Sequence, residues 1–363
     1  MKCFLKMRLD ELGEFGLIER LRKKVKLFSK DAIVGIGDDA AVLKYDKNNF
    51  MILTTDMLVE DVHFSLEYFK PEQIGMKAVE QNVSDIAAMC GTPKYALVSL
   101  AIPKNTDVSF IERLYDGINK SSRKYKISIV GGNISSSKKI IVDVAMAGFV
   151  RKKNLALRRN AKKGDLIFCS GNVGKSACGL ELLRKNKKGV SAKYHLEPKS
   201  RLDLSGKLSQ IGINAVIDVS DGVAPEILHL CKKSKVGARV FIEKIPISKS
   251  TISDAKKIGK KPFELALYGG EDFELIFTAP KNNLEKLKDL DCKAIGEIVS
   301  KKDGIKFFKN GKLVRLRRGF EHFRNEFVKE RHLDIGESVA FEVFKKVDLK
   351  PLLGRGKHLK LDA

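Results

Sequence analysis

The sequence lacks tryptophan, a long apolar run and any pair of cysteines at metal-binding spacing. Its best apolar run, residues 140–150, is interrupted by Asp143 and predicts a buried strand rather than a membrane helix. The N-terminus is too charged for a signal peptide, so we expect a cytoplasmic protein that does not associate with a membrane. Scattered cysteines in that compartment predict reduced, buried thiols and give no support to a zinc site.

The chain has few acidic residues relative to basic ones: 45 Asp and Glu against 69 Lys and Arg, which gives a net charge of +24. Such a balance can indicate nucleic-acid binding. Here the basic residues are spread over several short segments, and no aromatic residues alternate with them as base stacking requires. We therefore favour a solvated basic surface that attracts anionic substrates, and expect no nucleic-acid partner. A non-catalytic nucleic-acid-binding protein is the alternative from another class of function.

The length of 363 residues predicts two domains with an appendage. Residues 1–150 combine helices and strands in an α+β half. The basic segment 151–164 predicts a domain boundary, and residues 151–323 alternate strands with helices, which is typical of α/β layers. We therefore expect an α/β fold. Residues 324–363 lack this pattern and form an extension of unknown role.

Hydrophobic periodicity predicts the positions of most elements. Helices are expected at residues 11–24, 76–91, 110–125, 175–185 and 224–234. Strands are expected at residues 95–103, 127–133, 139–150, 165–171, 214–220 and 238–246.

The acidic residues gather in short segments that adjoin apolar strands, at residues 37–39, 54–56, 82–85, 218–221 and 269–272. One such segment alone would indicate only a helix cap or a tight turn. We expect each of them where a strand gives way to a turn or a helix, because sites are commonly built on loops held by a scaffold. Carboxylates with neighbouring hydroxyl groups favour Mg²⁺, which in proteins usually serves phosphates.

The standard nucleotide-binding and nucleophile motifs are absent. Residues 171–176, GNVGKS, would complete a phosphate loop only with glycine at position 169, where Cys169 stands. The start of the helix that follows is still a possible anion site. His195 and His229 are isolated and expected to be structural, whereas His63, seven residues after Asp56, belongs either to a capped strand end or to the site.

The chain resembles thiamine-monophosphate kinases in a series of segments that occur in that family's order: GEFGLIERL, VGIGDDAAVL, LTTDMLVEDVHF, NVSDIAAMCGTPKYALVSLAIP, LRRNAKKGDLI, IDVSDG, LYGGEDFELIFT and GFEHF. The resemblance implies a two-domain, PurM-like fold of the aminoimidazole-ribonucleotide-synthetase type, with an N-terminal sheet that pairs across a homodimer. It also implies that ATP and thiamine monophosphate give ADP and thiamine diphosphate, with several Mg²⁺ ions. Direct in-line attack on the γ-phosphate is our hypothesis, because the attacking phosphate oxyanion needs no strong base.

The resemblance also assigns site residues. The implied metal ligands are Asp38, Thr54, Thr55, Asp56, Asp85, Asn133, Asp218 and Asp221. The implied nucleotide contacts are Tyr115, Gly132, Asn133, Arg158 and Ser220, where a slip of one residue would select Arg159 instead of Arg158. The implied substrate contacts are His63, Glu271 and Phe320, and the roles of Asp39 and Asp272 stay open.

Asn133 departs from the family, which usually has an acidic residue at this position. The amide oxygen of Asn133 can still bind Mg²⁺, but one negative charge is lost. The substitution would weaken one metal site or signal a sister specificity.

Three alternative families share the implied fold and the use of ATP. Selenophosphate synthetases have a reactive cysteine in an N-terminal glycine-rich loop, whereas Cys3 of this chain does not lie in a glycine-rich segment. The related hydrogenase-maturation proteins have a C-terminal cysteine, whereas this sequence ends in Ala363. Aminoimidazole-ribonucleotide synthetase matches the VGIGDDAAVL and GGEDFEL segments less closely and is the nearest alternative.

Overall fold

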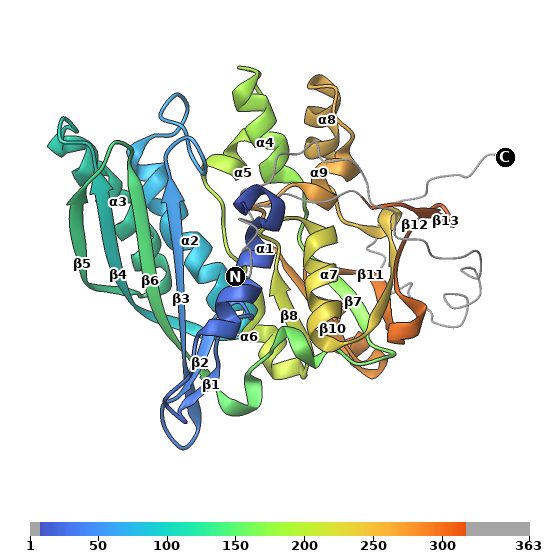
Figure 1. Cartoon of the computed structure of the whole chain (residues 1–363). Helices are drawn as coiled ribbons and strands as arrows, with labels where there is room; N and C mark the ends of the chain where they lie inside the picture. Colours follow the sequence, from blue (N-terminus) through green and yellow to red (C-terminus); the bar gives the residue numbers. More distant parts are fainter. Residues whose placement is uncertain (1–7, 317–363) are drawn as a thin grey trace, which may run out of the picture.

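The computed structural model describes residues 8–316, which form two β-sheets with helices packed against them (Figure 1). The first sheet has the strand order β1-β2-β3-β6-β4-β5. Its strands are β1 (Ala32–Val34), β2 (Ala41–Lys44), β3 (Asn49–Val59), β4 (Thr92–Ile102), β5 (Ser128–Ser136) and β6 (Ile141–Arg151). Neighbouring strands are antiparallel, except that β5 runs parallel to β4.

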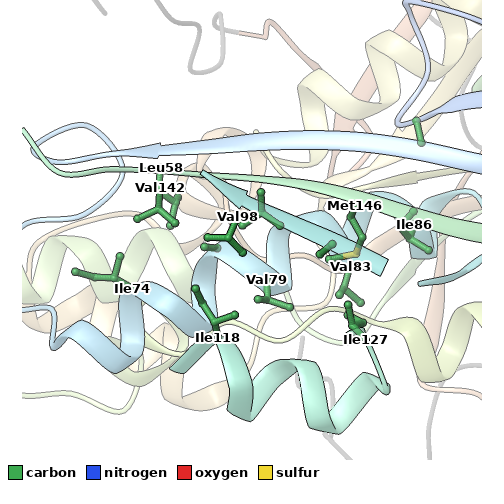
Figure 2. Close-up of a cluster of buried hydrophobic side chains, with 14 of the residues drawn as sticks. Leu58, Ile74, Val79, Val83, Ile86, Val98, Ile118, Ile127, Val142 and Met146 are labelled. Carbon is green, nitrogen blue, oxygen red and sulfur yellow. The ribbon is translucent and has the colours of Figure 1, made fainter. Parts of the chain in front are cut away.

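Helices α2 (Pro71–Ala88) and α3 (Val108–Tyr125) cover one face of this sheet, which we call the inner face. In Figure 2, Val79 and Val83 of α2 lie between Val98 and Met146 of the sheet on one side and Ile118 of α3 on the other. The two helices approach closely, since a Cβ added at Gly75 would lie 2.0 Å from the carbonyl oxygen of Leu114. Burial of this apolar face supplies the main stabilisation of the first half.

The second sheet has the order β13-β12-β9-β11-β7-β10-β8. Its strands are β7 (Leu166–Ser170), β8 (Ala215–Asp218), β9 (Gly237–Phe241), β10 (Leu275–Ala279), β11 (Cys292–Val299), β12 (Ile305–Lys309) and β13 (Lys312–Val314). Although strands and helices alternate along the chain, most neighbouring strands are antiparallel, and among those described β9 and β12 are the parallel pair.

Helices cover both faces of the second sheet. One face packs against α7 (Val223–Ser234) and α9 (Pro262–Tyr268). The other packs against α6 (Leu202–Ile211) and α10 (Leu284–Leu287), where Ala87 and Ala88 at the end of α2 join the same core. Helix α2 therefore belongs to the cores of both halves.

The remaining helices are short or peripheral. They are α1 (Leu9–Lys24), α4 (Lys175–Arg184), α5 (Ala192–Leu196), α8 (Lys249–Lys257) and the 3₁₀ turns η1 (Lys152–Asn154), η2 (Arg158–Asn160), η3 (Ile242–Lys244), η4 (Lys281–Asn283) and η5 (Lys301–Asp303). Among the described helices, none is long and apolar enough to cross a membrane.

Strand β3 separates its side chains between the two faces of the first sheet. Ile52 and Leu58 are buried on the inner face, whereas Leu53 and Met57 point to the outer face. Met57 is 50% exposed, and Leu97 of β4 on the same outer face is 46% exposed. The outer face therefore exposes large apolar side chains that remain uncovered within the described part of the chain.

The two mixed sheets with their helices confirm the expected α/β fold class. Phe320 and the extension 324–363 lie outside the described residues, so their expected roles have no structural outcome.

Candidate active site

Asp38 and Asp39 lie in the turn between β1 and β2 and both face Arg158 of η2. The Arg158 guanidinium binds Asp39 with two nitrogen atoms, and its Nε lies 2.9 Å from Asp39 Oδ2. The backbone N–H of Arg158 donates to Asp38 Oδ1 at 3.4 Å. Arg158 therefore pairs with both aspartates, whereas the neighbouring Arg159 is exposed.

Asp39 lies beside two further carboxylates, and we call Asp39, Asp85 and Asp218 the acidic cluster. One oxygen atom from each lies within 4.8 Å of the others. Asp85 comes from α2 and Asp218 from the end of β8, so the cluster joins the two halves of the chain. The Ser84 hydroxyl donates to Asp218 Oδ2 at 2.6 Å and leaves the other oxygen of Asp218 for a further partner.

Thr54 and Asp56 point to the inner face of the first sheet, toward the acidic cluster. The Thr54 hydroxyl donates to Asp85. Thr55, between them, points to the outer face because successive side chains of a strand alternate, and its hydroxyl donates to Asp143 Oδ1 at 3.1 Å. The structure therefore brings Thr54 and Asp56 to the cluster but places Thr55 on the opposite side of the sheet.

Burial and the repulsion of neighbouring carboxylates raise the pKa values of Asp38, Asp56, Asp85 and Asp218. Burial, followed by the charge of Asp39, raises the pKa of Asp38 to about 7 and that of Asp218 to about 8. Burial and the charge of Asp143 raise the pKa of Asp56 to about 7. The pKa of Asp85 is also well above its usual range, because the group is buried near Asp56 and Asp218. One arginine does not neutralise so many acids.

Ser220 and Asp221 form the turn that follows β8. The Ser220 hydroxyl donates to Glu226 Oε1 at 3.2 Å, and the Asp221 N–H donates to the same oxygen at 3.0 Å. Burial and the charge of Asp221 raise the pKa of Glu226. Helix α7 thus orients this turn beside the acidic cluster.

Two acidic segments do not occupy the turns expected for them. Thr54–Asp56 lie in the middle of β3, because threonine suits a strand and the alternation of faces continues through them. Asp85 lies inside α2, whose helical apolar spacing extends through residues 82–85. The expectation that each acidic segment lies where a strand gives way to a turn or a helix is wrong for these two, and also for residues 269–272, which follow helix α9 and precede β10.

Glu271 and His63 meet at a buried lysine, Lys77 of α2. Lys77 Nζ lies 2.6 Å from Glu271 Oε1 and donates to the backbone oxygen of His63 at 2.7 Å. Glu271 Oε2 lies 3.3 Å from Nδ1 of His195, another buried side chain. Although burial would raise the pKa of Glu271, the charge of Lys77 lowers it below its usual value. The structure therefore brings together two of the three expected substrate contacts.

The N-terminus of α4, the candidate anion site, already has a carboxylate partner. Asp272 accepts hydrogen bonds from the backbone N–H groups of Gly174 and Ser176. Lys175, which a phosphate loop would direct at phosphate, pairs instead with Glu274. A ligand anion at this helix end would have to displace Asp272, so the structure gives the GNVGKS segment a structural role.

The other expected nucleotide contacts lie elsewhere in the first half. Tyr115 lies on α3 and packs against the core of the first sheet. Gly132 and Asn133 lie on β5, where Asn133 pairs with Ser99 and Ser99 in turn pairs with Asp143. Asn133 and Asp143 consequently share a row on the outer face, separate from the acidic cluster.

The donor set of the acidic cluster suits a divalent cation. Carboxylate oxygens from three segments converge within 4.8 Å, and the Thr54 and Ser84 hydroxyl groups border them. Such oxygen-only sets suit Mg²⁺ rather than zinc. A bound cation would relieve the repulsion that raises the pKa values of Asp85 and Asp218.

We expect the metal-free protein to become more stable as the pH falls from about 8.5 to about 6.5. Asp38, Asp56 and Asp218 take up protons in the folded state with pKa values of about 7 to 8. Unfolded aspartate titrates near pH 4, so the folded state binds more protons in this window and stability rises as the pH falls. The melting temperature measured in EDTA should rise by roughly 2–5 °C.

Saturating Mg²⁺ should flatten this trend, because the cation holds the carboxylates ionised. The window stays above about pH 6.5, since protonation of His195 and His229 in the unfolded state would lower stability at more acidic pH. A melting temperature in EDTA that falls between these two pH values would contradict the raised carboxyl pKa values.

Reasoning from the sequence missed several residues of this site. Asp39 had no assigned role, although its position beside Asp38 was the available signal. Asp143, whose charge raises the pKa of Asp56 from the outer face, interrupts an apolar run and carries no other signal in the sequence. Lys77 gave no signal, because a lysine in an amphipathic helix is ordinarily assigned to the solvated face.

Comparisons with known proteins agree with the fold. The chain matches the family described as AIR synthase related protein, by its N-terminal domain over residues 37–150 and its C-terminal domain over residues 162–308. It is 40% identical to the thiamine-monophosphate kinase of Aquifex aeolicus, with 87% of this chain and 100% of that protein covered. It is 36% identical to the thiamine-monophosphate kinase of Bacillus subtilis, with 86% and 100% covered. A solved structure described as AaThiL complexed with AMPPCP and TMP superimposes with a TM-score of 0.78 at 40% identity, covering 88% of this chain and 99% of that chain.

Proposed function

The chain belongs to the family of thiamine-monophosphate kinases and transfers a phosphoryl group from ATP to thiamine monophosphate, and we propose that its acidic cluster holds Mg²⁺ for this reaction. The observation that carries the proposal is the convergence of Asp39, Asp85 and Asp218 within 4.8 Å at the junction of the two halves. When bound there, Mg²⁺ would neutralise the charge that accumulates on the phosphates.

Transfer proceeds in line in this proposal. A phosphate oxygen of thiamine monophosphate forms a bond to the γ-phosphorus of ATP, while the bond from that phosphorus to the β–γ bridging oxygen breaks. ADP leaves with the bonding electrons, and the configuration at the γ-phosphorus inverts. The attacking oxyanion requires no base, so the chain must chiefly hold two anionic substrates in contact.

Side chains on both sides of the acidic cluster would position the two substrates. Arg158 adds a cation at the edge of the acidic cluster, where it would also face the nucleotide phosphates. Ser220 lies in the turn after β8, whose geometry Glu226 fixes. Glu271 and His63 would contact thiamine monophosphate on the Lys77 side of the site.

The outer face of the first sheet is the proposed homodimer surface. Leu53, Met57, Tyr95 and Leu97 are large apolar side chains exposed together on β3 and β4. An uncovered apolar face of this kind supports pairing with a second copy through the same sheet.

The proposal places the enzyme in the cytoplasm. The five cysteines of the described residues carry free thiols, and all of them are buried. Buried, unpaired thiols fit a reducing compartment.

The activity is tested by ADP release from Mg²⁺-ATP across a small panel of substrates. We expect thiamine monophosphate to stimulate release by at least about 10²-fold over the ATPase background, and chelation of Mg²⁺ to abolish the stimulation. Stimulation by aminoimidazole precursors in place of thiamine monophosphate would overturn the assignment.

A further inference from the structure

Besides its apolar contacts, helix α2 makes hydrogen bonds and an ion pair with the second half of the chain along one polar stripe. The stripe residues are spaced by three or four positions, so they share one side of the helix. They are Gln73 with Glu197, Lys77 with Glu271, Glu80 with Ser200, Ser84 with Asp218, and the Ala87 carbonyl with Ser205. Successive turns of α2 therefore make hydrogen bonds or an ion pair with different residues of the second half.

Lys77 is a charged member of this stripe, and its side chain is 0% exposed. Its ammonium contacts the Glu271 carboxylate at 2.6 Å and the His63 carbonyl oxygen at 2.7 Å, and it lies 5.3 Å from the centre of the Phe69 ring. A buried ammonium needs such a set of partners, because an unpaired charge in this environment is strongly unfavourable. Since it is fully enclosed, Lys77 cannot itself contact a substrate.

The two partners of Lys77 come from different halves of the chain. His63 follows β3, and its ring Nδ1 accepts a hydrogen bond from the Val59 N–H at 3.0 Å. Glu271 belongs to the turn at residues 269–272 and has a φ of +63°, which is unfavourable for a residue with a side chain. Strained residues persist where their surroundings hold them in place.

The contacts of Glu271 supply that restraint. Its N–H donates to the Ser220 carbonyl oxygen at 2.8 Å, and its carboxylate lies between Lys77 and His195. The carboxylate is nevertheless 28% exposed, which leaves it accessible to a ligand. Glu271 is thus held in a fixed orientation while it faces the site.

We infer that Lys77 is a positioning residue for thiamine monophosphate, because one buried ammonium joins His63 of the first half to Glu271 of the second. The inference rests on the proposed function, which makes His63 and Glu271 the substrate contacts. Lys77 acts through these two residues and touches neither substrate.

The same helix also sets the position of the substrate relative to the acidic cluster. Asp85 lies eight residues after Lys77 on α2, a rise of about 12 Å along the helix axis. Ser84 holds Asp218 of the second half at 2.6 Å. Because one rigid helix binds Glu271 through Lys77 and Asp218 through Ser84, it fixes the distance between the substrate contacts and the acidic cluster.

The test is Lys77→Met, compared with Lys124→Met as a matched control. Lys124 pairs with Glu80 of the same α2 stripe at 3.2 Å, so the control also removes a lysine–glutamate pair from this helix. We expect Lys77→Met to raise the KM for thiamine monophosphate about 10-fold or more and to change the KM for ATP less than about 2-fold. Calorimetric binding of thiamine monophosphate without nucleotide should weaken by a similar factor, and Lys124→Met should leave both constants unchanged.

A double variant separates positioning from a purely structural role. Lys77→Met leaves Glu271 without its cation and should lower the melting temperature, whereas the neutral pair Lys77→Met with Glu271→Gln should recover part of it. The substrate affinity of the double variant should stay as low as that of Glu271→Gln alone, because both changes act through one carboxylate.

Two results would overturn the inference while the wild type phosphorylates thiamine monophosphate. One is an unchanged KM for thiamine monophosphate in Lys77→Met. The other is a KM that returns to the wild-type value together with stability in the double variant. A wild type that does not respond to thiamine monophosphate would instead refute the proposed function.

Discussion

Asp218→Asn is expected to lower kcat by about 10²–10³-fold while making the metal-free protein more stable. The Asp218 side chain is only 2% exposed at the end of β8, and it faces Asp39 and Asp85. Above about pH 8, where Asp218 is ionised, its replacement removes one negative charge from a set of mutually repelling carboxylates, so the free energy of unfolding in EDTA should increase. The same replacement removes a ligand charge that Mg²⁺ needs, so the metal requirement for activity should rise.

The opposite signs of these two effects make the experiment informative. Asparagine can still accept the hydrogen bond from Ser84, so the fold around β8 should be retained. Steady-state kinetics across a Mg²⁺ series, with thermal unfolding in EDTA, would measure both effects. Glu297→Gln is the control, since Glu297 is a buried carboxylate on β11 of the same sheet and pairs with Arg239 away from the cluster.

Normal kinetics in Asp218→Asn at limiting Mg²⁺ would remove the cluster from the mechanism. A loss of stability as large as the loss in Glu297→Gln would show instead that Asp218 is held by favourable contacts rather than strained by repulsion. The first result would require another location for the metal.

Local patterns in the sequence predict much of this fold. The apolar spacing of residues 76–91 and 110–125 predicts two of the helices, and α2 (Pro71–Ala88) and α3 (Val108–Tyr125) cover most of these ranges. Alternation along β3 also explains why Thr54 and Asp56 reach the acidic cluster while Thr55 does not. These features depend on neighbouring residues in the chain, which is why a single sequence shows them.

Contacts between the halves depend on tertiary packing and could not be predicted in this way. The sequence favoured Asp38 over Asp39 as the metal ligand, whereas the structure groups Asp39 with Asp85 and Asp218. The ligand role of Asp38 itself stays a prediction. Lys77 meets Glu271 across 194 residues of chain, and no local periodicity encodes such a pairing. The antiparallel pairing in the second sheet could not be predicted from the sequence either, because alternation of strands and helices does not specify strand direction.

Arg158→Met is expected to destabilise the metal-free protein by about 3–5 kcal/mol. Arg158 binds Asp39 through two nitrogen atoms, and the Asp39 side chain is fully buried. Burial alone would lower the pKa of Arg158, but the charge of Asp39 raises it above its usual value, which shows how strongly the pair is coupled. Removal of the guanidinium leaves Asp39 uncompensated beside Asp85 and Asp218.

Mg²⁺ should restore part of this loss, because a divalent cation at the acidic cluster replaces the missing positive charge. The measurement is urea unfolding with EDTA and with saturating Mg²⁺, and the gain in stability from Mg²⁺ should be larger in Arg158→Met than in the wild type. Arg159→Met is the matched control, since the neighbouring side chain is exposed and its loss should cost less than about 0.5 kcal/mol. Adding Asp39→Asn to Arg158→Met should also recover stability, because the uncompensated charge is then gone. Equal stability of the Arg158→Met and Arg159→Met variants in EDTA would show that Arg158 does not neutralise the cluster.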